Sequence, residues 1–448
     1  MVALVLALSL ARPAAASEDE SLTALRDAET ELLFREISAP LARAAQLDPG
    51  SVDVVLLNST TVNAFVSQGQ RVYLFAGLLL EADNVNQIQG VIAHELGHVA
   101  GGHVIRVQSG SSEATGITIA TMILGALAIA AGAGDAGMGI MMAGQRAALG
   151  RFLAFSRAQE SSADAAAATY LSKAGISARG LMETYAKFQN REYRLAIYAT
   201  DSYDRTHPLS RDRIRTLEET VKNDPAWDKP VDPDLERRFQ RLKGKLLGFV
   251  NPKLATVKYP ESDQSVPAHY ARAYAYHLGG YPNKALAEAE ALLAIDPEDP
   301  FFLELKGQIL LESGRPADAI APLRKATFLA DNTPLIASML GHALISTEKP
   351  ANFEEAKQVL RTAISSDNQN PFAWYQLGII YDREGDTSRA ALANAERNNL
   401  EGKPELALAS AQLAMKGIAL GTPDYLRAQD IAMVSRFELE KKKGKRNK

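Results

Sequence analysis

The segment His94-Glu95-Leu96-Gly97-His98 constrains this chain most, because it requires a helix that brings two histidines to one metal ion. Residues four apart in a helix point in nearly the same direction, so His94 and His98 share a face. Two imidazoles at this spacing can bind one zinc ion. Glu95 lies one position further round, where a carboxylate can take a proton from water at the same ion. The segment predicts a catalytic metal site, although these residues can also occur by chance in an alanine- and glycine-rich helix.

A zinc site needs a third protein ligand, and the sequence offers two candidates. A helix that continues past His98 would turn His103 about 180° away from His94. We therefore expect His103 to support the site rather than to bind the ion. Glu160 is the better candidate, because Glu160 and Asp164 are four apart on an alanine-rich helical stretch and share a face. This pair suits a carboxylate ligand backed by an acid that orients a ligand histidine.

Two β-rich runs before the motif predict a small sheet beside its helix. Residues 52–57 and 70–75 are rich in valine, leucine and aromatic residues, and Gln68-Gly69 is a turn signal between them. A helix from about residue 86 then carries the two histidines. The edge of a neighbouring strand could pair with an extended substrate backbone, which would make cleavage tolerant of sequence. The two runs are equally compatible with strands of an ordinary sheet that has no role in binding substrate.

Several segments together resemble the gluzincin metalloproteases related to the CAAX prenyl protease, over residues 35–220 of the chain. They are Asn63-Ala64-Phe65, Gly77-Leu78-Leu79, Val91-Ile92-Ala93-His94-Glu95-Leu96-Gly97-His98 and Ser156-Arg157-Ala158-Gln159-Glu160-Ser161-Ser162-Ala163-Asp164. The resemblance implies a zincin-type metalloprotease domain.

The same resemblance implies a role for each matching residue. His94, His98 and Glu160 would bind zinc, and Glu95 would be the general base. Asp164 would assist, as a proton donor or by supporting a ligand. Candidates for contacts behind the ligands or with substrate are Asn63, His103 and Arg157.

His207 is a further candidate ligand. It lies in Thr206-His207-Pro208, which is also adequate chemistry for the turn that begins a helix. The chain resembles periplasmic members of the family with a C-terminal repeat domain, in which a loop histidine can take the open fourth position on zinc. His207 would then be an inhibitory fourth ligand that excludes the exchangeable water needed for catalysis.

The stretch between the two zinc motifs is apolar and has two interpretations. Residues 114–134 contain no charged side chain, and their length would permit a membrane-spanning helix. They are rich in glycine, alanine and threonine, with few bulky residues. We expect an apolar helical hairpin at 115–149 that walls the cleft or touches a membrane or an unfolded client; a membrane span is the alternative.

The N-terminus predicts export from the cytoplasm. Residues 1–11 are an apolar run without lysine or arginine, too short to span a bilayer, and Ala14-Ala15-Ala16 is a small-residue cleavage site. We expect a signal peptide over residues 1–16, cleaved after Ala16, and a periplasmic protein. The chain has no cysteine, which fits an oxidising compartment and excludes a lipid anchor on a mature N-terminal cysteine.

The C-terminal half contains a tetratricopeptide-type repeat. Trp374, Leu377-Gly378 and Tyr381 have the spacing that opens such a repeat. Equivalent glycines at 307, 341 and 378 are 34 and 37 residues apart. We expect a metalloprotease domain at 17–225, a connector at 226–266, repeats at 267–436 with a terminal helix pair that caps the array, and a basic tail at 437–448. Such an array would bind extended segments or a partner protein.

The expected fold is α+β and mostly α: a zincin-type domain with a small sheet, followed by an all-α repeat solenoid. The expected function is a zinc endopeptidase of the bacterial cell envelope, with one Zn²⁺ per subunit, that degrades or helps stalled outer-membrane β-barrel proteins. The repeats would dock it on the outer-membrane assembly machinery, with peripheral membrane contact. The net charge of −4 argues against nucleic acid. Alternatives are a chaperone or adaptor with structural zinc, and an integral-membrane metalloprotease.

Overall fold

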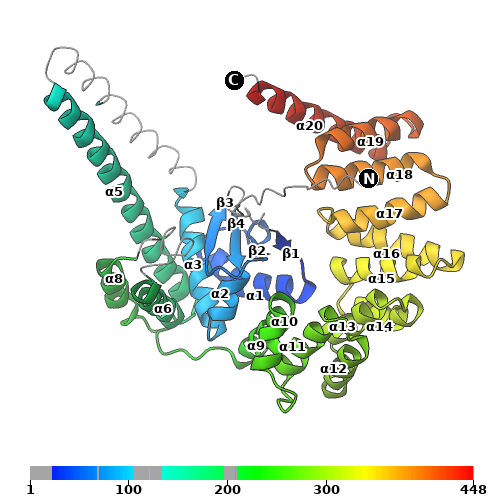
Figure 1. The fold of residues 1–448 in the computed structure, drawn as a ribbon, viewed down its shortest axis with the longest axis horizontal. Coiled ribbons are helices and arrows are strands. Elements are labelled where there is room, and N and C mark those ends of the chain that lie inside the picture. The colour runs from blue at the N-terminus through cyan, green and yellow to red at the C-terminus, as the bar shows by residue number, and fades with distance from the viewer. Residues whose placement is uncertain are drawn as a thin grey trace, which may run out of the picture.

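The computed structural model describes residues 23–67, 70–103, 121, 134–195, 207 and 209–446. These residues are mostly helical and contain one small sheet (Figure 1). The sheet and helices α1 to α8 form the catalytic half, and the helices from α11 onward form a curved array of helical hairpins. The expected fold class is confirmed.

The sheet has four strands in the order β1-β2-β4-β3. The two β-rich runs form β2 (Asp53–Leu57) and β4 (Arg71–Phe75), which pair in parallel. Between them in sequence lies β3 (Ala64–Ser67), which the sequence analysis did not predict and which pairs antiparallel with β4 at the sheet edge. The short strand β1 (Ala24–Leu25) pairs antiparallel with β2. Among the strands that the structure describes, β3 is therefore an edge strand, and it also contacts the helix that carries the two histidines.

That helix, α3 (Val85–Ala100), lies in the centre of the catalytic half. Asn84 caps its N-terminus by accepting a hydrogen bond from the backbone N–H of Gln87, and every residue from Val85 to His98 is buried. A helix that is buried all round must be enclosed by other elements. Here they are α1 (Ala28–Ala44), α5 (Gly134–Ala174), α6 (Arg179–Leu195) and the sheet.

The contact of α3 with α5 is closest at Gly97. A Cβ atom placed on Gly97 would lie 2.8 Å from the carbonyl oxygen of Ala163. No side chain larger than hydrogen fits there unless one helix moves. Because Ala163 lies between Glu160 and Asp164 in sequence, this contact brings that pair close to the helix of His94 and His98.

Helix α5 is 41 residues long and its first part projects away from the body of the molecule (Figure 1). The hairpin expected at 115–149 lies largely outside the described residues, which include only Thr121 and the first turns of α5 from that stretch. Met138 and Met142, on these turns, are exposed. Within the described ranges, no helix combines the length and apolar character needed to cross a membrane.

The C-terminal half stacks helices in antiparallel pairs, and many of them begin with proline, whose missing N–H costs nothing at that position. The short helical turn Pro350–Asn352 lies between Gly341 and Gly378, and it accounts for their separation of 37 residues instead of 34. The helices are α11 (Val266–Leu278), α12 (Pro282–Ile295), α13 (Pro300–Glu312), α14 (Pro316–Leu329), α15 (Pro334–Ser346), α16 (Phe353–Ser366), α17 (Pro371–Arg383), α18 (Thr387–Leu400), α19 (Pro404–Gly417) and α20 (Pro423–Arg446).

Buried charges join the two halves where α1 begins. Helix α9 (Pro233–Val250) packs against both α1 and α11, and α10 (Pro252–Lys258) follows it. Lys245 of α9 forms ion pairs with Asp27 and Glu29, and Arg241 forms ion pairs with Glu29 and Asp299. The start of α1 is therefore held by side chains of α9 and of the repeats.

We expect Gly97→Ala to destabilise the protein and to weaken its affinity for metal, because the added methyl group separates α3 from α5. Overpacking of this kind costs about 1–3 kcal/mol. Urea denaturation followed by circular dichroism would measure the loss. Gly50→Ala is the matched control, since a Cβ at that position meets only the Asp48 side chain at an ordinary 3.5 Å. Equal stability and metal affinity for the two variants would contradict this account of the α3–α5 contact.

Candidate metal centre

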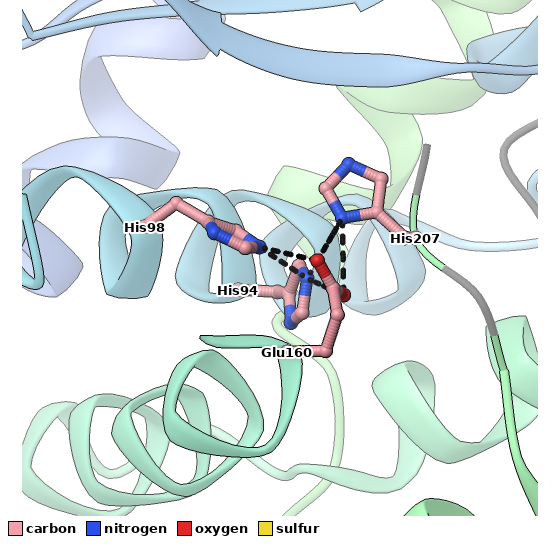
Figure 2. A group of neighbouring side chains, drawn as sticks. All are labelled: His94, His98, Glu160 and His207. Atoms are coloured by element: carbon pink, nitrogen blue, oxygen red, sulfur yellow. Dashed lines mark hydrogen bonds and ion pairs between the residues drawn. The ribbon is translucent and has the colours of Figure 1, made fainter. Parts of the chain in front are cut away.

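Four buried side chains from separate parts of the chain converge beside α3 (Figure 2). His94 and His98 come from α3, Glu160 from α5, and His207 from the segment that precedes α8 (Arg211–Val221). One ligand atom from each lies within 4.8 Å of the others. The structure therefore brings together both histidines of the motif and the downstream glutamate, and adds His207.

The spacing of these atoms matches a tetrahedral metal site. His94 Nε2 lies 3.1 Å from His98 Nε2 and 3.3 Å from His207 Nδ1. Glu160 oxygens lie 3.3 Å from His98 Nε2 and 3.2 Å from His207 Nδ1. Tetrahedral ligands about 2.0–2.1 Å from a zinc ion are roughly 3.4 Å from one another. Three imidazole nitrogens and one carboxylate are also a donor set that zinc accepts.

The electrostatics of the cluster favour a positive charge at its centre. Burial opposes protonation of His94, but hydrogen bonds to Asp164 and Glu160 outweigh it and raise the pKa of His94 to about 10. Burial and the charge of His94 lower the pKa of His98 to about 2, so His98 is neutral and has a free lone pair. A metal ion supplies the positive charge that the two carboxylates attract.

Glu95 is buried beside the cluster with no hydrogen-bond partner for either carboxylate oxygen among the described residues. The nearest cation-forming group is His207, whose Nε2 lies 3.5 Å from Glu95 Oε1. Burial raises the pKa of the Glu95 carboxyl above its usual value. A buried carboxylate without a partner is costly and is found where chemistry requires it.

Asp164 lies behind His94 rather than beside the ligand atoms. Its Oδ1 is 3.1 Å from His94 Nδ1, which fixes the ring with Nε2 pointing into the cluster. Burial opposes ionisation of Asp164, but hydrogen bonds from His94 and Arg213 lower its pKa to about 2. Asp164 is thus a carboxylate throughout the neutral range.

Two side chains that the sequence analysis did not assign to the site hold Asp164 in place. The hydroxyl of Tyr185 on α6 donates a 2.6 Å hydrogen bond to Asp164 Oδ1. Arg213 on α8 donates to Asp164 Oδ2 at 2.8 Å, and its Nη1 lies 3.2 Å from Glu160 Oε2. In the sequence, only the proximity of Arg213 to His207 indicates that Arg213 belongs to the site. No sequence feature indicates this for Tyr185.

The other predicted site residues lie outside the four-residue cluster. Helix α3 ends at Ala100, and Gly102, with φ of +63°, turns the chain so that His103 Nδ1 lies 2.9 Å from His98 Nδ1. The helix does not continue as the sequence analysis assumed, and His103 contacts a candidate ligand from behind. Asn63 precedes β3 and accepts a hydrogen bond from the N–H of Ala64. Arg157 is exposed on α5 and lines a groove that Asp164 also borders.

The chain has metalloproteases among its relatives. The chain is 24% identical over 390 residues to the Beta-barrel assembly-enhancing protease of Escherichia coli (strain K12), covering 83% of this chain and 76% of that protein. It is 27% identical over 215 residues to Metalloprotease LoiP of the same strain, covering 47% of this chain and 79% of the relative. Among solved structures, MamA is 25% identical with a TM-score of 0.29, covering 39% of this chain and 96% of that one.

A match to a known protein family identifies the domain that contains the cluster. Residues 28–221, which include every side chain of the cluster, match Peptidase family M48. The resemblance drawn from the sequence motifs is confirmed by this match and by the metalloprotease relatives. Residues 28–221 are therefore a domain of peptidase family M48, and the chain is a metalloprotease.

Proposed function

We propose that the chain is a zinc endopeptidase of the bacterial cell envelope that degrades misfolded or stalled outer-membrane and periplasmic proteins. The observation that carries the proposal is the buried cluster of His94, His98, Glu160 and His207. Beside it lies Glu95, whose carboxylate oxygens have no hydrogen-bond partner among the described residues. The mixed nitrogen and oxygen donors support zinc, one ion per subunit. The name of the assembly-enhancing relative supports β-barrel proteins as clients. The predicted signal peptide supports the periplasm as the location.

In this proposal His94, His98 and Glu160 hold the ion and Glu95 moves the proton. When bound, zinc polarises the peptide carbonyl and makes water a better nucleophile. Glu95 takes the proton of the attacking water and delivers it to the leaving amine. Asp164 keeps the ring of His94 oriented, and Tyr185 and Arg213 in turn fix Asp164.

His207 acts as a plug in this proposal. Its Nδ1 lies within hydrogen-bond distance of both Glu160 oxygens and of His94 Nε2, at the fourth corner of the cluster. Its Nε2 faces Glu95, where the water to be activated must lie. With an ion held by His94, His98 and Glu160, His207 would have to move away before substrate could reach the site. A site with four protein ligands is also typical of structural zinc, so this feature favours a chaperone with a structural ion as the second candidate.

Substrate would reach the site as an extended chain. The β3 edge next to α3 has backbone groups available for an added strand, which gives affinity without sequence specificity. We further propose the division into a protease domain at 17–225, a connector at 226–266 and repeats at 267–436 that bind clients or dock on the assembly machinery. Removal of a signal peptide after Ala16 is part of the same proposal.

Zinc should stabilise the chelator-treated protein, because it binds the folded cluster. At a free zinc concentration a hundred times its Kd, the gain is about 2.7 kcal/mol. Differential scanning calorimetry would detect the rise in Tm, and elemental analysis would give the stoichiometry. Glu160→Gln should lose most of the rise, whereas Glu219→Gln, which removes an exposed charge on α8, should keep it. An undiminished rise in Glu160→Gln would remove Glu160 from the ligand set.

Glu95→Gln should lower the rate of casein hydrolysis by about 10²–10⁴-fold, because it removes the general base and keeps the shape of the side chain. The variant should still bind one zinc ion. A fluorogenic casein assay at matched zinc content makes the comparison. If Glu95→Gln retained the activity of the unmodified protein, the ion would be structural and the chaperone interpretation would replace this one.

His207→Ala should increase casein hydrolysis, because it removes the plug. If the unplugged form makes up about 1–10% of the resting protein, the increase is roughly tenfold to a hundredfold. The double variant His207→Ala/Glu95→Gln serves as the control and should be inactive. A decrease in kcat/KM for His207→Ala would instead make His207 a required ligand or substrate contact.

A further inference from the structure

A cavity of about 560 Å³ lies where the start of α1 and the end of α9 face the inner surface of the repeats. Among the described residues that line it, none belongs to the metal centre. Its size falls within the range of about 300–1,000 Å³ found for ligand pockets. The catalytic half supplies one wall and the repeats supply the other, so the cavity exists only because the two halves are docked.

The repeat wall of the cavity is built from equivalent positions of successive repeats. Tyr274 on α11, Gln308 on α13 and His342 on α15 are each 34 residues apart. Glu304 and Ser338 lie one helical turn earlier, again 34 residues apart. Successive repeats therefore present polar side chains at regular intervals along one surface. Regular intervals suit an extended polypeptide, whose side chains also recur at a fixed spacing.

Apolar side chains complete the lining. Phe249 of α9 and Phe372 of α17 line the cavity and are 40% and 42% exposed. Leu311 and Met339 lie between them on the repeat wall and are half-buried. An apolar group of a ligand would cover these surfaces.

Most charges at the cavity are already paired within the protein. Lys245 pairs with Asp27 and Glu29, and Arg26 pairs with Glu31 and Asp367. Glu312 accepts hydrogen bonds from His277 at 2.6 Å and from Gln308 at 2.9 Å. The positive groups are thus neutralised by acids of the protein itself.

Glu304 is the exception. It is only 8% exposed, it lines the cavity, and none of the described residues forms a hydrogen bond or ion pair with its carboxylate. Burial raises the pKa of Glu304 to about 8, and the charge of Lys245 opposes this only in part. A cation that arrived from outside would stabilise the ionised carboxylate and form a charge-assisted hydrogen bond with it.

We propose that this cavity binds an extended polypeptide segment in which a lysine or arginine adjoins an apolar residue, with the cation paired to Glu304 and the apolar group against Phe249 and Met339. The inference rests on the proposed function, because it names the kind of client segment that the repeats select. An acidic segment would be repelled by the Glu304 carboxylate, because both carry negative charge. The chain's own Glu18-Asp19-Glu20 is therefore not the expected occupant.

Fluorescence anisotropy on the full-length chain with Glu95→Gln, which cannot cleave the probe, tests the proposal. The probes are two labelled glycine- and serine-rich peptides, one with a central Phe-Lys pair and one with Phe-norleucine. The Phe-Lys peptide should bind about tenfold to a hundredfold more tightly, the contribution of a hydrogen bond to a charged group. Adding Glu304→Gln should remove this preference while binding of the norleucine peptide persists, which also shows that the variant is folded.

Glu290→Gln is the matched control, because it removes an exposed charge from the outer surface of α12 and should leave the preference intact. Met339→Trp should fill the cavity and weaken both peptides. Equal affinity for the two peptides, an unchanged preference in Glu304→Gln, or unchanged binding in Met339→Trp would each overturn the proposal. Because binding is measured without catalysis, failure here is distinguishable from failure of the protease assignment, which the casein assay reports.

Discussion

The contact between α3 and α5 at Gly97 is the constraint on which the metal centre depends. Two histidines on one helix can hold an ion only if a third ligand approaches from another helix at the right distance. Because Gly97 has no side chain, the backbone of Ala163 can lie against α3, and this places Glu160 within 3.3 Å of His98. The glycine of the motif is thus as necessary to the geometry as the ligands, although it contributes no donor atom.

The buried acidic groups of the site favour a positive charge among them. Glu95, Glu160 and Asp164 are buried carboxyl groups, and Arg213 is the guanidinium that contacts two of them. A buried charge without compensation is strongly destabilising, so these acids favour a positive charge at the cluster, whether from a protonated His94 or from a metal ion. Arg213 offsets part of the negative charge, because it contacts both Glu160 and Asp164.

Local spacing was predictable from the sequence, and long-range packing was not. The helical repeat of the backbone puts His94 and His98 on one face whatever surrounds them, so the motif could be interpreted directly. Tyr185 and Arg213 reach Asp164 only because α6 packs against α3 and α8 packs against α5, and nothing in their neighbouring residues indicates this. Strand β3 was missed because its residues, Ala64 to Ser67, do not alternate between apolar and polar. The cavity at Glu304 combines residues more than 200 positions apart, which no local pattern encodes.

The ionic contacts at the start of α1 have a consequence for how client capture relates to catalysis. Buried ion pairs such as Lys245 with Asp27 lose much of their Coulomb energy to desolvation, so they are weak evidence for added stability. Their geometry, however, ties the start of α1 to α9 and, through Arg241 and Asp299, ties α9 to the repeats. Helix α1 contacts α3 and borders the cavity at its first turn. In the proposed binding mode, a client beside Glu304 therefore lies next to a helix that packs against the helix of the two histidines.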